Sequence, residues 1–520
     1  MIYIALPAMN EKELENSILN LQFQTLLPKA VYVCVNQPLA YFSDGDPAHG
    51  DICKVNRHAL KQLQIWQQSQ KLPFDLECID RCSLENAWPK NRVGVGWARK
   101  TAMDAINQIA SDKDIIVCMD ADTYYPNTYL QNIQKIFASH PKVVGLANPY
   151  YHEIFSSPSY LKNSVNSMSC QELSPKVAEP PRTAPELAPE LAEYSNFSPK
   201  VAKPPRTAPE LAPELAEYSK FDENSPFGSP FKVQENSDTN PNSLQKTYLH
   251  YEVYMRAYAI QMYLSNHPYR FTAIGSCMAS PVWAYRKING ITPCKSGEDF
   301  YFLQKLAKIG PLAVHSPSVA IPSARVSDRV FFGTGPALRK GLQGDWKSYP
   351  IYPWALFDAM QQSYNALGDF YENPTTTDFP LKAYWSEKFG DRWWEKLQQN
   401  SAGRKSQFIR LCIQKIDALR CLQYLKEHYA FDDFTDRVNL RNLCYLLAQK
   451  EQDRTEVAHP PSPPKELKRE EPNDRFPFLN ALSQKQKLSD LTALEWAEIR
   501  NFLFLCERRI QQNHPILPSW

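Results

Sequence analysis

The sequence has few glycines, almost no net charge and no long apolar run, and each shortage narrows its class. Only 17 of its 520 residues are Gly, which excludes a glycine-rich fibrous or low-complexity chain. The 58 Lys and Arg residues almost balance the 56 Asp and Glu residues, and the formal charge is +2, so we expect no nucleic-acid partner. No stretch approaches the roughly 18 consecutive apolar residues of a membrane span, and the N-terminus shows no signal peptide. We therefore expect a globular protein without a membrane span.

Cysteine usage indicates a reducing compartment. The 12 cysteines include no Cys-x-x-Cys pair, and several lie inside apolar runs, as Cys34 and Cys118 do. Buried, reduced thiols of this kind are typical of cytoplasmic proteins and not of secreted disulfide frameworks. We therefore predict a cytoplasmic location, and a lipid-linked substrate would leave peripheral membrane contact open.

The first 150 residues alternate strand-like and helix-like segments. Residues 2–6 form a short apolar run, and Asn10 is placed to cap a following helix, with Glu13 three positions on. Further apolar runs at 30–35 and 114–120 have the continuous apolar character of strands that are buried on both faces. This alternation predicts an α/β fold, Rossmann-like, with a mostly parallel sheet flanked by helices.

A near-perfect tandem duplication interrupts this pattern. The segment SPKVAEPPRTAPELAPELAEYSNF (174–197) is followed directly by SPKVAKPPRTAPELAPELAEYSKF (198–221), a period of 24 residues. Proline breaks helices and sheets, and two copies are too few for a stacked solenoid. We therefore predict a disordered, Pro-rich insertion over residues 155–243. Such a segment either docks a protein partner in the polyproline conformation or is a surface linker, and we favour the linker.

Composition divides the rest of the chain into further parts. Glycines, short strands and loops alternate over residues 244–345, so we expect this part to complete the α/β domain that residues 1–154 begin. After it we expect a helical, aromatic-rich region (346–452), a Pro- and charge-rich linker (453–475) and a C-terminal helical segment (476–520) with a capping box at Thr492 and Glu495.

Two carboxylates come directly after the apolar residues 115–119. Asp120 and Asp122 are two positions apart, so in an extended chain their side chains face the same way. Mg²⁺ and Mn²⁺ prefer oxygen ligands of this kind, and such a pair can hold the cation against a diphosphate. Alone, the pattern is also that of a solvated turn or of a cap for the next helix.

Four short motifs follow one another along the chain, and their joint order is more specific than any one of them. They are Pro7-Ala8-Met9-Asn10-Glu11 after the first strand, Gly94 to Arg99 at a helix start, Asp120-Ala121-Asp122, and Gly297-Glu298-Asp299 at a later helix start. In this order the chain resembles the family 2 glycosyltransferases of the GT-A fold, over about residues 1–150 and 245–345. The resemblance implies a GT-A-like domain that binds a nucleotide-sugar donor at the carboxyl ends of its strands.

The resemblance also implies roles for individual residues on the donor side. Pro7, Asn10 and Glu11 would line the nucleoside pocket, Arg99 would reach the base or the diphosphate, Asp120 would bind the ribose or the metal, and Asp122 the metal. In the family an acid ends the second strand; Asn36 and Gln37 stand there in this chain, which leaves the nucleotide open, and Asp80 is a candidate substitute. Arg325 and Arg329 fall where relatives have a loop over the donor and would clamp the diphosphate, although a surface cluster around Asp328 is equally consistent.

The acceptor side is implied to centre on Glu298 and Asp299. By resemblance Asp299 would be the general base that deprotonates the acceptor hydroxyl, with Glu298 as its neighbour. The alternative is an ordinary helix start, in which Ser296 caps the helix and both acids are stabilised by the helix dipole. His315 falls where some relatives have a metal ligand, although a loop histidine is the simpler interpretation.

These features predict a metal-dependent glycosyltransferase of polysaccharide biosynthesis. It would use Mn²⁺ or Mg²⁺ and transfer a sugar, with inversion, from a nucleotide-sugar to a hydroxyl of a saccharide or lipid-linked acceptor. A nucleotidyltransferase is the rival enzyme, but it usually has a Gly-rich basic loop after the first strand, which residues 8–11 do not form. A non-catalytic scaffold that keeps the donor fold is the rival outside enzymes.

Overall fold

The computed structural model describes residues 1–152, 241–294, 297–323, 334–452 and 476–518. Both copies of the tandem duplication and the 453–475 linker lie outside the described residues, as do Ser296, Arg325, Asp328 and Arg329. All described residues belong to one compact unit. None of the helices in these ranges combines the length and the apolar character that a membrane span requires.

An eight-stranded sheet forms the centre of this unit, in the order β10-β8-β6-β7-β4-β1-β2-β3. Its strands are β1 (Ile2–Ala8), β2 (Ala30–Asn36), β3 (Asp75–Arg81), β4 (Ile115–Cys118), β6 (Gly145–Ala147), β7 (Met278–Pro281), β8 (Leu312–Ala313) and β10 (Ile516–Leu517), and a separate ribbon joins β5 (Thr123–Tyr124) to β9 (Ile321–Pro322). Strands β1 to β4 pair in parallel, as do β6 and β8, whereas β7 and β10 are antiparallel to their neighbours. The mostly parallel α/β sheet that the sequence predicts is therefore confirmed.

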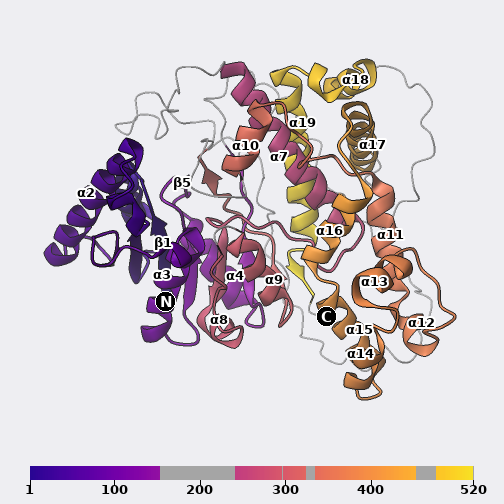
Figure 1. Cartoon of the computed structure of the whole chain (residues 1–520), viewed down its shortest axis with the longest axis horizontal. Coiled ribbons are helices and arrows are strands. Elements are labelled where there is room, and N and C mark those ends of the chain that lie inside the picture. The colour runs from indigo at the N-terminus through magenta and orange to yellow at the C-terminus, as the bar shows by residue number, and fades with distance from the viewer. Residues whose placement is uncertain (153–240, 295–296, 324–333, 453–475, 519–520) are drawn as a thin grey trace, which may run out of the picture. The chain divides into compact units, whose positions relative to one another are not determined.

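Helices flank the sheet and form two apolar cores with it (Figure 1). Along β1 the side chains alternate, so that Tyr3 and Ala5 face one core and Ile2, Ile4 and Leu6 face the other. The first core includes α3 (Val95–Ile109), α8 (Val282–Lys287) and α9 (Glu298–Ala307), and the second includes α1 (Leu14–Asn20), α2 (Pro47–Ser69) and α4 (Tyr129–Ser139). Burial on both faces explains the continuous apolar sequence of these strands.

A helical region follows the sheet domain in the chain and joins the first core. Its helices are α10 (Thr334–Leu342), α11 (Trp354–Asn365), α12 (Leu367–Glu372), α13 (Lys382–Phe389), α14 (Glu395–Asn400), α15 (Lys405–Lys415), α16 (Ala418–His428), α17 (Asp433–Gln452) and α18 (Pro477–Gln484). Aromatic rings pack on one another here; the Trp385 ring centroid lies 5.1 Å from that of Phe379 and 5.8 Å from that of Trp393. The helical, aromatic-rich character that the sequence predicts is present, and these aromatic residues belong to the core.

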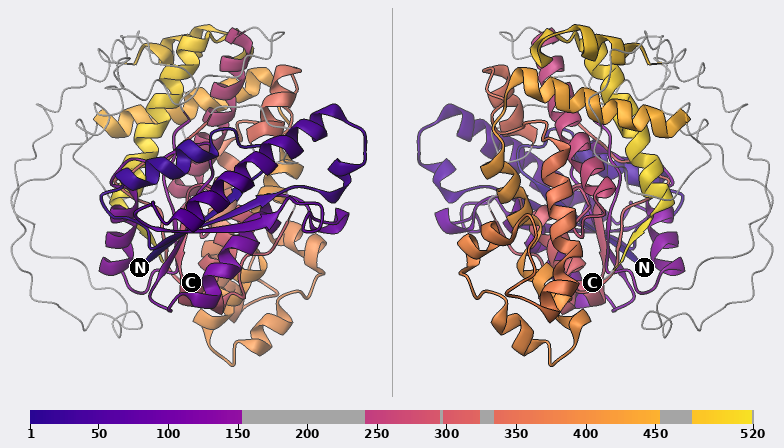
Figure 2. Two further views of the ribbon diagram at one scale, coloured as in Figure 1. Left: turned by 90° about the vertical axis from the view of Figure 1, so that its left-hand side faces the viewer. Right: turned by 90° about the vertical axis from the view of Figure 1, so that its right-hand side faces the viewer.

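The C-terminal helix α19 (Ala493–Asn513) joins the end of the chain to the sheet domain. It packs along α7 (Pro241–Leu264), and the two helices run side by side in Figure 1 and Figure 2. After α19, strand β10 adds to the edge of the sheet beside β8. The helix begins with the capping box that Thr492 and Glu495 predict.

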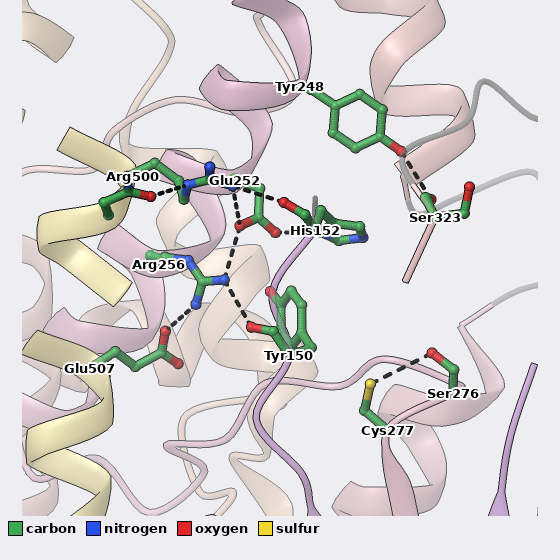
Figure 3. A network of polar contacts seen from close by, with 11 residues as sticks. Tyr150, His152, Tyr248, Glu252, Arg256, Ser276, Cys277, Ser323, Arg500 and Glu507 are labelled. Carbon is green, nitrogen blue, oxygen red and sulfur yellow. Dashed lines mark hydrogen bonds and ion pairs between the residues drawn. The ribbon is translucent and has the colours of Figure 1, made fainter. Parts of the chain in front are cut away.

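A buried charge network connects α7 to α19 (Figure 3). Arg256 on α7 pairs with Glu252 one turn earlier at 2.9 Å and with Glu507 on α19 at 2.8 Å. His152 contacts Glu252 through its ring, and Arg500 on α19 donates to the His152 carbonyl oxygen at 2.9 Å. All five residues are more than nine-tenths buried. Removing one member of such a network is strongly destabilising, because it leaves a buried charge without compensation.

Candidate functional site

The motif residues of the first half gather at the carboxyl ends of β1, β2 and β4. Pro7 is a buried residue near the end of β1, Asn36 is the last residue of β2, and Asp120 follows β4. The strands are direct neighbours, since Ala5 of β1 is paired with Cys118 of β4 and β1 also pairs with β2. This is the edge at which open α/β sheets bind their ligands.

The loop after β1 differs from its predicted conformation. Helix α1 begins at Leu14 with Glu13 as its N-cap residue, so the expectation that Asn10 caps this helix is wrong. Asn10 has a φ of 56°, which is left-handed, whereas an N-cap residue is usually extended. Its backbone N–H donates to the side chain of Asn56 at 2.8 Å. Asn10 and the mostly buried Glu11 therefore belong to a turn that continues directly from β1.

Asn36 and Asp80 are both engaged in hydrogen bonds at the strand ends. Asn36 is buried, and its Nδ2 donates to the Ala8 carbonyl oxygen at 2.9 Å. Asp80 accepts from the backbone N–H groups of Cys82 and Ser83 at 2.8 and 2.9 Å. Burial acts to raise the pKa of Asp80, but these hydrogen bonds outweigh it and lower the pKa overall. Asp80 thus stabilises the turn after β3.

Arg99 on α3 connects two of the predicted motifs. Its Nη2 donates to Asp120 Oδ1 at 3.0 Å, and its Nε donates to Glu298 Oε1 at 3.1 Å. The Arg99 side chain is 1% exposed, and its Nη1 has no hydrogen-bond partner among the described groups. Gly275 makes room for the guanidinium, because a Cβ at that position would lie 2.5 Å from Nη2. Acids that are far apart in the sequence are thus held on one buried cation.

Asp299 lies beside this ion pair, in the first turn of α9. The N-cap residue is Gly297, with a left-handed φ of 81°, and no side-chain hydrogen bond caps the helix. Burial, followed by the charge of Glu298, raises the pKa of Asp299 to about 7, although the Phe300 N–H and the Arg99 charge act in the opposite direction. A carboxylate with a pKa near neutrality is suited to accept a proton at physiological pH.

The backbone around Asp120 and Asp122 is fixed from two sides. The Ser323 N–H, directly after β9, donates to the Asp122 carbonyl oxygen at 2.9 Å. The Asp120 N–H donates to the Tyr125 hydroxyl at 3.0 Å, and that hydroxyl donates to the Ser276 carbonyl oxygen at 3.1 Å. The Asp120-Ala121-Asp122 motif is therefore held in part by segments that come from the other half of the domain.

Two tyrosines of α7 contribute to the site without having been predicted to do so. The Tyr248 hydroxyl donates to the Ser323 carbonyl oxygen at 3.4 Å (Figure 3). Burial raises the pKa of Tyr251, the neighbouring Tyr349 and Tyr254 raise it further, a hydrogen bond with Thr334 lowers it, and the charge of Asp299 raises it more weakly than any of these. The only sequence signal was a tyrosine stripe at helical spacing, and such a stripe is typical of ordinary core packing.

Asp120 and Asp122 are the two carboxylates that the sequence predicts as ligands of a divalent cation. In the part of the chain that the structure describes, no group of three or more His, Cys, Asp or Glu side chains is arranged to hold a metal ion. Asp120 is 31% exposed and meets Arg99 through one oxygen, and Mg²⁺ is commonly bound by one or two carboxylates together with substrate phosphates. His315 instead contacts Arg508 at 3.4 Å, and burial, with that cation, lowers its pKa to about 4.

Fold and site together define an α/β protein with acids from two separate motifs converging at the carboxyl edge of its sheet. No family model and no curated protein matches the chain. Structural matches include the crystal structure of S. aureus TarS, at 12% sequence identity and a TM-score of 0.29, over 82% of this chain and 55% of TarS. The chain spans about half the length of TarS, and a similarity at this level does not establish a family or a function.

Proposed function

We propose that the protein is a metal-dependent glycosyltransferase that moves a sugar from a nucleotide-sugar donor to a hydroxyl of a saccharide or lipid-linked acceptor. The observation that supports this most is the convergence of Asp120, Glu298 and Asp299 around the buried Arg99. It brings a candidate base beside a candidate cation site, at the edge where sheets of this type bind ligands.

In this proposal Asp299 is the general base. Its carboxylate takes the proton of the acceptor hydroxyl while the acceptor oxygen bonds to the anomeric carbon. The bond between that carbon and the diphosphate oxygen breaks, its electron pair leaves with the nucleoside diphosphate, and this single displacement inverts the anomeric centre. Glu298 is less suited to the role, because its Oε1 accepts from Arg99 and its side chain is 3% exposed.

The strand ends supply the donor side. Pro7, Asn10, Glu11 and Asn36 would border the nucleoside, and Asp120 and Asp122 would hold Mn²⁺ or Mg²⁺ against the diphosphate. When bound, the cation stabilises negative charge on the departing diphosphate. Arg99 acts through the acids that it orients, since its charge is already shared between Asp120 and Glu298.

Release of nucleoside diphosphate from a panel of UDP-, GDP-, CDP-, TDP- and ADP-sugars tests the proposal, with Mn²⁺ and with water or saccharides as acceptor. We expect turnover with one nucleotide, lost in Asp122→Ala and lowered roughly 10²- to 10⁴-fold in Asp299→Asn. Asp51→Asn is the control, because Asp51 is an exposed acid on α2 that pairs with Lys54, and it should leave turnover unchanged.

Each other outcome has a distinct meaning. Turnover that survives Asp299→Asn would remove Asp299 as the base while leaving the donor site in place. Pyrophosphate release from nucleoside triphosphates would identify a nucleotidyltransferase. No turnover and no nucleotide binding would favour the non-catalytic scaffold.

A further inference from the structure

Helix α2 carries one polar residue in its buried apolar stripe. Leu60 and Leu63 face the second core and Cys53 is also buried, and Asn56 lies among these residues with 2% of its surface exposed. A buried carboxamide is unfavourable unless its donors and acceptor find partners. The hydrogen-bond partners of Asn56 therefore indicate its structural role.

Asn56 bonds to the chain at two strand ends. Its Oδ1 accepts from the Asn10 N–H at 2.8 Å, and its Nδ2 donates to the Asn36 carbonyl oxygen at 3.1 Å and to Gln37 Oε1 at 2.8 Å. Asn10 is the residue with the left-handed φ of 56°, a conformation that its surroundings must hold in place. One carboxamide thus fixes the turn after β1 against the end of β2.

Gln37 extends the same network to the third strand. Its N–H donates to the Arg81 carbonyl oxygen and its own carbonyl oxygen accepts from the Trp88 N–H, both at 3.0 Å. Gln37 is 1% exposed, and its Nε2 donates to Cys53 Sγ at 3.2 Å. We call Asn56 and Gln37 the amide pair; it connects the segments that follow β1, β2 and β3.

We infer that Asn56 is a positioning residue for the nucleoside part of the donor, acting through Asn10 and Asn36. The inference rests on the proposed function, which places a nucleotide at these strand ends. Asn56 is itself too buried to touch a ligand, so it works by setting the turn conformation before the nucleotide arrives. Preorganisation of this kind strengthens binding without adding a contact.

Two variants of opposite volume isolate the lost hydrogen bonds. Asn56→Leu fills the site and Asn56→Ser leaves a small gap, and both lose the bonds to Asn36 and Gln37. Leu60→Ala is the matched control, because Leu60 lies on the same buried stripe of α2 and its truncation destabilises the core without touching the turn. The probes are UDP, GDP, CDP, TDP and ADP with Mn²⁺, measured by thermal shift and by calorimetry.

We expect both Asn56 variants to weaken binding of the preferred nucleoside diphosphate roughly tenfold or more, equivalent to about 1.4 kcal/mol. The KM for the nucleotide-sugar should rise by a similar factor with kcat nearly unchanged, whereas Leu60→Ala should lower Tm and leave the Kd unchanged. The inference is overturned if the Asn56 variants bind as the wild type does, or if Leu60→Ala weakens binding equally. A wild type that binds none of the five nucleotides would overturn the proposed function, and this inference with it.

Discussion

Replacing Asp299 by Asn should make the protein more stable near neutral pH while sharply lowering its activity. Burial and the charge of Glu298 raise the pKa of Asp299 from 3.8 to about 7. Because the folded pKa lies above the unfolded value, the folded protein keeps a proton over the window from about pH 4 to about pH 7 that the unfolded chain loses. The free energy of unfolding of the wild type therefore falls as the pH rises through this window.

The size of the effect follows from the shift. At about 1.4 kcal/mol per pKa unit, the ionised Asp299 carboxylate lowers the free energy of unfolding by at most about 4 kcal/mol. Partial solvent exposure of the side chain reduces this to about 2 kcal/mol. Asp299→Asn should therefore raise the Tm by a few degrees at about pH 8 and leave it nearly unchanged at about pH 4.

Glu298→Gln is the matched control, since it neutralises the adjacent acid in the same helical turn. Glu298 is 3% exposed and accepts from Arg99 Nε at 3.1 Å, so losing its charge should destabilise the fold by about 1 kcal/mol. If both acids served only the helix dipole, each substitution would destabilise by about 0.3–1 kcal/mol. An Asp299→Asn variant that melts below the wild type at pH 8 would refute the reasoning.

Three further changes have defined outcomes. The kcat/KM for donor turnover should rise with pH along a limb with an apparent pKa near 7, because only the ionised Asp299 accepts a proton, and a flat pH profile would contradict this. Gly275→Ala should lower turnover roughly 10- to 100-fold, because its Cβ displaces Arg99. Gly50→Ala is the control and should leave turnover unchanged, because its Cβ meets nothing within 4 Å. Equal turnover in the two variants would contradict the role of Arg99. Arg256→Met should reduce the free energy of unfolding by about 3–5 kcal/mol by removing the buried cation that Glu252 and Glu507 share, and a Tm equal to that of the wild type would show that the network is dispensable.

The central strands could be predicted because their sequences are local signals. The apolar runs at 30–35 and 114–120 correspond to β2 and β4, as expected for strands buried on both faces. Strand β7 enters the sheet between β4 and β6 in the antiparallel sense, and β10 joins its edge from the far end of the chain. Both are short and defined by tertiary pairing, so no local pattern indicates them.

The sequence predicted the residues of the candidate site better than it predicted the contacts between them. Motif order named Asp120, Glu298 and Asp299, but only the packing of α3 shows that Arg99 links the first two. Asn10 was wrongly predicted as a helix cap, because the deciding contact comes from Asn56 on another helix. A polar residue in the apolar stripe of α2 was the one signal that could have found Asn56.

The most direct test of the donor site is a thermal-shift panel of UDP, GDP, CDP, TDP and ADP, each with and without Mn²⁺. A ligand at a hundred times its dissociation constant stabilises the folded state by about 2.7 kcal/mol. We predict a metal-dependent rise in Tm with one nucleotide, and we predict that Asp122→Ala loses it. No rise with any nucleotide, with or without the metal, would contradict a nucleotide-sugar site at this edge of the sheet.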